Sequence, residues 1–340
     1  MSVDHATFDR ISQALETDAQ TYFPGRDVDQ VRIVRTIIRP YSQLARASIR
    51  FRDGEVLKTY IKLYRHPKLP HTHNQDSAER EHSAHKTLHE AFQGLDGCTV
   101  VRPIAVFREW GGWVMENVDG RTLDSILRTK GNRISSVFSM AKLRRYASLT
   151  GRWLQHFQRS TRHDATVSLE SAGVRQEIES ALEDCEAFAR EERDRIIDCS
   201  ERLCSQTTQT SLGVVGQHGE CFTPHHIFVS KGRVVVFDIT GIKDGPAYED
   251  LASLWVSLEA MLKYPLFKAS DVEELQAAYL EGFSAEREID ESVFQLYVLK
   301  HMLKLLASWT RRSKGASFAA LRSSAGRRFA RNWLLNRVRD

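Results

Sequence analysis

Cysteine is scarce in this sequence, and no two cysteines form a C-x-x-C pair. The 340 residues contain five cysteines scattered along the chain: Cys98, Cys185, Cys199, Cys204 and Cys221. An odd, dispersed set provides no disulfide framework, and it lacks the paired spacing of a structural zinc site. The pattern therefore predicts reduced thiols in a cytoplasmic protein.

Long apolar runs are missing as well. No stretch of about 18 apolar residues is present, which argues against a membrane-spanning helix. The polar start MSVDHATFDR lacks the apolar segment of a signal peptide. The net charge of +4 is small and does not by itself identify an anionic partner. With 41% hydrophobic residues, the chain has enough apolar content for one large domain or two lobes.

The first third of the sequence has the pattern of strands. Alternating or β-branched runs predict strands at 31–38, 46–51 and 55–64, and the turn residues RDG join the last two into a hairpin. The helical pattern of residues 76–92 follows, with Asp76 or Ser77 as the expected N-cap.

Most of the remaining sequence has a helical pattern. It includes a long helix at 135–160, a highly charged helical hairpin at 168–208 and most of the chain after Tyr248. A hinge-like stretch at 116–120 separates the two halves. We therefore predict an α+β protein with a β-rich N-terminal lobe, 1–116, a mostly helical C-terminal lobe, 117–340, and a cleft between them.

Two charged residues in the first half are candidates for nucleotide chemistry. Lys62 lies inside the strand TYIKLY, where its ammonium group could hold phosphates, although a lysine on the exposed side of an edge strand has the same pattern. Glu81 lies in the next helix and could pair with Lys62 and fix its position, although it also suits a solvated helix face.

Two segments in the second half add further candidates. HGECFTPHHIFV, residues 218–229, has the form of a catalytic loop that leads into a strand. In VVVFDITG, Asp238 ends an apolar strand, where its carboxylate suits a magnesium ion or, alternatively, forms a turn. Asp250, in GPAYEDLA, is expected to cap or brace the start of a helix.

The order of these segments resembles the aminoglycoside phosphotransferase and choline kinase group, over roughly residues 30–260. VVRPIAVFREWGGWVMENVDGRTLDSIL is similar to the run through that group's hinge, and GRVVVFDITG with GPAYEDLA is similar to its metal-binding strand and following helix. The resemblance implies a two-lobed, protein-kinase-like fold that uses ATP and Mg²⁺. It implies that Lys62 contacts the α- and β-phosphates, that Glu81 orients Lys62 and that Asp238 holds the metal. The adenine slot would be lined by Met115, Glu116, Asn117 and Val118.

The sequence departs from that group in its phosphate loop and its catalytic loop. RPYSQLARAS, residues 39–48, stands in place of a glycine-bearing loop, which leaves Ser42 and nearby backbone N–H groups as phosphate contacts. We assign the HG pair, beginning with His218, to the start of the catalytic loop and Glu220 to the catalytic base, with a one-residue bulge. The other alignment places Cys221 at that position.

The same bulge makes His226 the counterpart of the group's metal-binding Asn. Since imidazole suits softer ions than Mg²⁺, Mn²⁺ is an alternative metal. His226 could instead bond phosphate, and the two histidines 225 and 226 could simply pack the loop.

The substrate has to be inferred from the helical half. Six acidic residues of 168–208 could attract a cationic substrate or form a solvated face: Glu177, Glu179, Glu183, Asp184, Glu186 and Glu191. The basic C-terminal segment, 311–340, could dock on its own lobe, lie on an anionic membrane or, least of all, bind nucleic acid.

We predict an ATP-dependent phosphotransferase that acts on a hydroxyl of a small molecule or glycan. The possible acceptors include a bacterial surface glycan or a lipid-linked sugar, because relatives with a similar RPYS opening resemble proteins of bacterial surface-glycan synthesis. We expect a cytoplasmic protein, which could also contact a membrane surface through its basic C-terminal helix. No nucleic-acid partner is expected. The rival interpretation is a pseudokinase that binds nucleotide or serves as a scaffold.

Overall fold

The computed structural model describes residues 3–66, 68–132, 139–170, 172–183, 185, 187–207, 211–219, 222–285, 288–312 and 318–338. Its internal contacts divide the chain into two compact units, which we describe separately. Unit 1 comprises residues 1–120 and 235–242, and unit 2 comprises 121–234 and 243–340. The lobe boundary between residues 116 and 117 stays a prediction.

Unit 1 is built on an antiparallel five-stranded sheet with the strand order β1-β2-β3-β6-β5. Its elements are α1 (His5–Thr17), α2 (Ala19–Tyr22), β1 (Val28–Ile38), β2 (Ser42–Phe51), β3 (Val56–Tyr64), α3 (His71–Ala91), β4 (Cys98–Val100), β5 (Pro103–Phe107), η1 (Arg108–Trp110) and β6 (Gly112–Glu116). The predicted hairpin at RDG is the β2–β3 connection.

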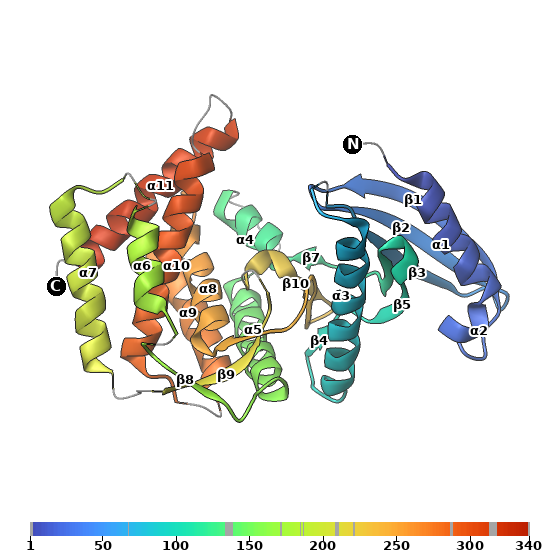
Figure 1. The fold of residues 1–340 in the computed structure, drawn as a ribbon, viewed down its shortest axis with the longest axis horizontal. Helices are drawn as coiled ribbons and strands as arrows, with labels where there is room; N and C mark the ends of the chain where they lie inside the picture. The colour runs from blue at the N-terminus through green and yellow to red at the C-terminus, as the bar shows by residue number, and fades with distance from the viewer. Residues whose placement is uncertain are drawn as a thin grey trace. The chain divides into compact units, whose positions relative to one another are not determined.

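Helix α1 covers one face of this sheet (Figure 1). Its buried Phe8, Ile11 and Leu15 pack in one cluster with inward side chains of the strands, such as Ile49 and Ile61. Because side chains alternate between the two faces of a strand, Lys62, next to Ile61, points to the opposite face. The apolar packing on α1 therefore determines which face carries the lysine.

Helix α3 begins earlier than its sequence indicates. It starts at His71, after Pro70 at the N-cap, so the predicted N-cap at Asp76 or Ser77 is wrong. Pro70 suits that place because it has an extended backbone with ψ of 160° and needs no N–H partner. Ser77 is inside the helix, where its hydroxyl donates to the carbonyl of His73 at 2.7 Å.

Unit 2 is mainly helical. Its elements are β7 (Arg121–Thr122), α4 (Leu123–Asn132), α5 (Met140–Ser160), β8 (Thr166–Ser168), α6 (Val174–Glu183), α7 (Arg190–Gln206), β9 (Ser211–Gln217), η2 (Pro224–His226), β10 (Ile227–Ser230), β12 (Lys243–Pro246), α8 (Tyr248–Glu259), η3 (Ala260–Lys263), α9 (Ala269–Ser284), α10 (Glu291–Arg312) and α11 (Phe318–Arg337). Strand β11 (Arg233–Val236) spans the boundary between the units. Helices α6 and α7 form the predicted charged hairpin, and α5 is the later part of the predicted long helix, whose start includes residues 133–138 outside the described ones.

Two glycines allow α5 and α9 to approach closely. A Cβ atom at Gly151 would stand 2.1 Å from the carbonyl oxygen of Tyr279, and one at Gly282 would stand 2.1 Å from that of Ser148. Both neighbours are backbone atoms, which cannot move aside as a flexible side chain can. The contact between these two helices therefore requires glycine at both positions.

Helix α11 docks on unit 2 through its apolar side. Ala330 and Leu334 are buried, and the Trp333 indole donates to Glu259 at 2.9 Å. The guanidinium of Arg331 pairs with Glu192 at 2.7 Å. These apolar residues of α11 therefore pack within the protein. The contacts favour docking on its own lobe among the three alternatives for this segment. No helix within the described part of the chain is both long and apolar enough to cross a bilayer.

Candidate active site

Lys62 lies on β3 and is almost fully buried, with 7% of its surface exposed. Its Nζ atom contacts two carboxylates, Glu81 Oε2 at 2.7 Å and Asp238 Oδ1 at 2.6 Å. Burial by itself lowers the pKa of this amine, but the two carboxylates outweigh that effect and raise the pKa above its ordinary value. Lys62 is therefore a fixed cation, and the ion pair with Glu81 that the sequence predicts is present.

Glu81 is held by more than Lys62. Its side chain is 1% exposed, accepts a hydrogen bond from the Trp113 indole at 3.0 Å and another from the Tyr64 hydroxyl. Burial raises the pKa of the Glu81 carboxyl, while the charge of Lys62 opposes the rise. A buried ion pair remains stable only when further hydrogen bonds satisfy it, and these two donors do so.

Sequence reasoning missed both donors, although the spacing contains a signal for one of them. Tyr64 is two residues beyond Lys62 on the same strand, so the two side chains share a face. Trp113 is the cross-strand partner of Lys62 on β6, which only the observed strand pairing reveals.

Asp238 has a backbone conformation that few residues adopt. Its φ is +64°, in the left-handed region where aspartate is better tolerated than most other residues. The next residue, Ile239, donates its N–H to the Nε2 of buried His85 at 3.4 Å. Burial lowers the pKa of His85 to about 3, so the ring is neutral and can accept this bond. His85, one helical turn after Glu81, thus connects α3 to the segment that carries Asp238.

The oxygen chemistry at Asp238 fits a magnesium ion. Its side chain is 41% exposed, and one carboxylate oxygen already accommodates a cation, the Lys62 ammonium. Carboxylate oxygens are the ligands that Mg²⁺ and Mn²⁺ prefer. Within the described residues no group of three or more His, Cys, Asp or Glu side chains forms a ready metal site, so substrate phosphates and water would have to complete the coordination.

The residues predicted to line the adenine slot are the last two of β6 and the two that follow it. Met115 is buried, and the Glu116 carboxylate pairs with Arg102 at 2.6 Å. The backbone N–H groups of Glu116 and Asn117 each donate to a carbonyl of unit 1 at 2.9 Å. Val118 is half-buried, and its contact with adenine stays a prediction.

The catalytic-loop segment belongs to unit 2, where the structure describes both of its ends. His218 is buried, with its ring stacked on that of His226 at 4.8 Å between centroids. Glu220 and Cys221, the two candidates for the base position, lie outside the described residues. Asp238 and His226 belong to different units, and the proposed metal role of His226 stays a prediction.

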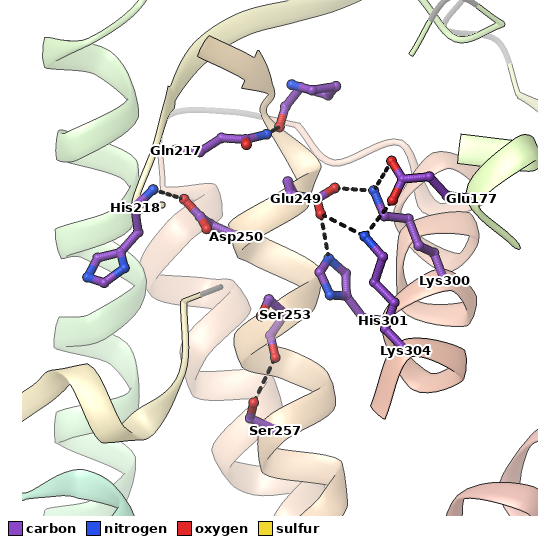
Figure 2. Close-up of polar contacts among 11 residues, drawn as sticks. Glu177, Gln217, His218, Glu249, Asp250, Ser253, Ser257, Lys300, His301 and Lys304 are labelled. Carbon is purple, nitrogen blue, oxygen red and sulfur yellow. Dashed lines mark hydrogen bonds and ion pairs between the residues drawn. The ribbon is translucent and has the colours of Figure 1, made fainter. Parts of the chain in front are cut away.

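Asp250 braces the segment that contains the loop. Its Oδ2 accepts the backbone N–H of His218 at 2.7 Å (Figure 2), and the N–H of Phe222 also bonds to it. Asp250 lies in the first turn of α8, as the sequence indicates. The ends of the loop are thereby tied to one buried carboxyl group, whose pKa burial raises to about 7.

This raised pKa predicts a pH-dependent stability. Between about pH 4, near the ordinary aspartate pKa, and pH 7 the folded state holds a proton that the unfolded chain has lost. The contribution is complete below about pH 4 and is lost as the pH rises through about 7, by up to roughly 4 kcal/mol. Relative to Asp250→Asn, the wild-type free energy of unfolding should fall over this range.

The measurement is urea unfolding of both proteins at intervals from pH 4.5 to pH 8. Asp164→Asn, at an exposed position of unit 2, provides the matched control and should follow wild type. Parallel pH profiles for wild type and Asp250→Asn would contradict the prediction.

His225, the other histidine of the loop, is held by α4. Its Nδ1 lies 3.2 Å from Asp124 Oδ2, and its Nε2 lies 3.1 Å from an Arg128 nitrogen. Arg128 in turn pairs with Asp124 at 2.9 Å. These contacts favour a packing role for His225, which was one of the interpretations of the tandem histidines.

Glu249, next to Asp250, forms a second, partly buried network (Figure 2). Its carboxylate contacts Lys300 Nζ at 2.5 Å and His301 Nε2 at 3.3 Å, both on α10. Lys300 and Lys304 also pair with Glu177 of α6. Burial alone would raise the pKa of Glu249, but the neighbouring His301 and Lys300 lower it to about 2.

Comparisons with known proteins identify the family and the fold. A model of the phosphotransferase enzyme family matches residues 37–291, three quarters of the chain. The structure is similar to a putative aminoglycoside phosphotransferase from Ralstonia eutropha JMP134, with a TM-score of 0.59 and 13% identity over 96% of this chain and 98% of that one. No curated protein matches the sequence.

Two further solved structures are similar over most of their length. A glucosamine kinase in complex with glucosamine, ADP and inorganic phosphate has a TM-score of 0.56 and 12% identity, over 91% of this chain and 83% of that one. The macrolide 2′-phosphotransferase MphH from Brachybacterium faecium has a TM-score of 0.52 and 18% identity, over 93% and 97%. At such identities the likeness shows the fold, and it confirms the predicted α+β, kinase-like class.

Proposed function

Because the chain belongs to the phosphotransferase enzyme family, we propose that it transfers the γ-phosphoryl group of ATP to a hydroxyl group of a small molecule or glycan. The observation that carries this proposal is the set formed by Lys62, Glu81 and Asp238 in unit 1. Phosphoryl transfer depends on positioned charge more than on covalent chemistry by the protein, and this set supplies a fixed cation beside a carboxylate that suits a metal.

Each residue of the set has a separate role in the proposal. Lys62 binds the α- and β-phosphates, and Glu81, itself held by Trp113, keeps the ammonium in place. Asp238 would hold Mg²⁺, or Mn²⁺, which neutralises charge on the phosphates when bound.

We assign proton acceptance from the acceptor hydroxyl to Glu220. This residue lies outside the described part of the chain, but Asp250 fixes the backbone on both sides of it through His218 and Phe222. A general base has to lie within hydrogen-bond reach of the proton it takes, so a braced loop supports the assignment.

A neutral, hydroxyl-rich acceptor fits unit 2 better than a cationic one. Glu177 and Glu179, two of the acids that could attract a cation, are paired with Lys300 and Arg175. This pairing leaves less negative charge to attract a cation, and it therefore supports a neutral sugar or glycan over a cationic acceptor.

The proposal can be tested in two stages. A thermal-shift assay first compares ATP and GTP with Mg²⁺ and Mn²⁺, in wild type and Lys62→Met. ADP release is then measured with hexosamines, aminoglycosides, oligosaccharides and lipid-linked sugars in vesicles, and mass spectrometry identifies any phosphorylated product. We expect ATP and metal together to stabilise wild type but not Lys62→Met, and at least one sugar acceptor to gain phosphate.

Two outcomes would overturn the proposal. Without any stabilisation by nucleotide and metal, neither the enzyme nor a nucleotide-binding function would stand. Nucleotide binding without ADP release from any acceptor or from water would favour the pseudokinase alternative, which the Glu in the catalytic loop and the absence of a glycine-bearing loop also suit.

A further inference from the structure

The sheet face that carries Lys62 also carries two arginines directly opposite each other. The strand register aligns Arg35 of β1 with Arg46 of β2, and Arg46 with Tyr60 of β3. The adjacent row aligns Leu44 with Lys62. Tyr60 and Lys62 are two residues apart, so both rows lie on the same face, opposite the face covered by α1.

Neither arginine side chain forms a close ion pair with an acid. Within the described residues, the side chains of Arg35 and Arg46 make no hydrogen bond or close ion pair, whereas Arg26 of the same unit pairs with Glu55 at 2.8 Å. Arg35 is exposed and Arg46 is half-buried. The exposed Asp119 carboxylate pairs with Lys58 at 3.4 Å, and its pKa is lowered by this contact and, to a lesser degree, by the charge of Arg46. Like charges directly opposite in a sheet are destabilising, so an anion bound between them would relieve a cost that the free protein carries.

The β1–β2 turn provides few backbone donors for such an anion. The N–H of Arg39 donates to the carbonyl of Ser42 at 2.8 Å, and Pro40 has no N–H. Only three residues separate β1 from β2, and none of them is glycine. A phosphate cradle made of several convergent N–H groups cannot form in a turn of this kind.

We propose that Arg35 and Arg46 bind the nucleotide phosphates and thereby replace the backbone donors of a glycine-bearing loop. This inference rests on the proposed function. Guanidinium groups bind phosphate in a bidentate manner, and adjacent rows on one face are about 7 Å apart along a strand, within the reach of an arginine side chain. Lys62 and the two arginines then form one phosphate-binding face on β1, β2 and β3.

The test compares the binding of ATP and adenosine by calorimetry, with Mg²⁺, in 50 mM and 300 mM NaCl. The variants are Arg35→Gln, Arg46→Gln and the double substitution. Arg50→Gln is the matched control, because Arg50 lies on the same strand and face as Arg46 but two rows farther from Lys62. Each lost charge-assisted contact should raise the Kd for ATP about 10-fold or more. The Kd for adenosine should not change, and the salt dependence of ATP binding should become weaker.

The outcomes separate this inference from the proposed function. If wild type binds ATP and the double variant binds it equally well, the arginines have no role at the phosphates, while the proposed function stands. An equal loss of ATP and adenosine binding would overturn the assignment to the phosphates. Wild type that binds no ATP removes the proposed function and this inference together.

Discussion

Glu220→Ala should lower the rate of phosphoryl transfer about 10²–10⁴-fold, the range that a positioned general base contributes. Binding of ATP and metal should persist, because the substitution leaves unchanged the residues proposed to hold them, Lys62, Glu81 and Asp238. The measurement combines kcat, from ADP release with the acceptor that the screen identifies, with the thermal shift by ATP and Mg²⁺.

Two neighbouring substitutions show whether the loop is aligned correctly. Cys221→Ala is the matched control and should change kcat little, because a thiol is a poor substitute for an oxygen base. His226→Ala should weaken nucleotide or metal affinity more than turnover. The reversed order, with Cys221→Ala inactive and Glu220→Ala fully active, would show that Cys221 holds the base position.

Asp238→Ala should abolish the stabilisation by ATP that depends on a divalent metal, and lower transfer by about 10²–10³-fold or more. The substitution removes the carboxylate that would hold the metal, and it also removes the second partner of Lys62. The fold should remain, because the side chain is 41% exposed and Glu81 still neutralises Lys62. Thermal shifts by ATP alone, metal alone and both together provide the measurement.

The matched control for this prediction is Asp76→Ala, which removes an exposed carboxylate from the same unit. It should keep the wild-type response to ATP and metal. An undiminished shift in Asp238→Ala would show that another group holds the metal.

The sequence was sufficient to predict the Lys62–Glu81 pair and the fold class. A lysine inside an alternating strand and a glutamate in the following helix have defined faces, and the apolar residues between them determine which face is buried. The position of Asp250 in the first turn of a helix was also predictable, but its partners were not, because the N–H of His218 lies 32 positions away in the sequence. The nucleotide-binding role of the pair stays a proposal.

Other parts of the site and of the fold could not be predicted, because they depend on contacts between residues far apart in the sequence. Trp113 reaches Glu81 only because β6 pairs with β3, and the bond from Ile239 to His85 joins residues 154 positions apart. Capping preference favours Asp76 as the N-cap, whereas α3 begins at His71 after an extended proline at position 70. Arg35 and Arg46 lie opposite each other only through the strand register, which the sequence spacing does not contain.

The adjacency of Glu249 and Asp250 has a consequence for how the protein is made. Glu249 ties α8 to α10 through Lys300. Asp250, the next residue, ties α8 to the backbone of His218. A ribosome delivers α8 about 50 residues before Lys300, so until then Glu249 lacks the cation that offsets its burial. We therefore expect α8 to pack firmly only late in synthesis, once α10 has left the ribosome. Asp250, on the same helix, would hold the backbone of His218 in place only from that point.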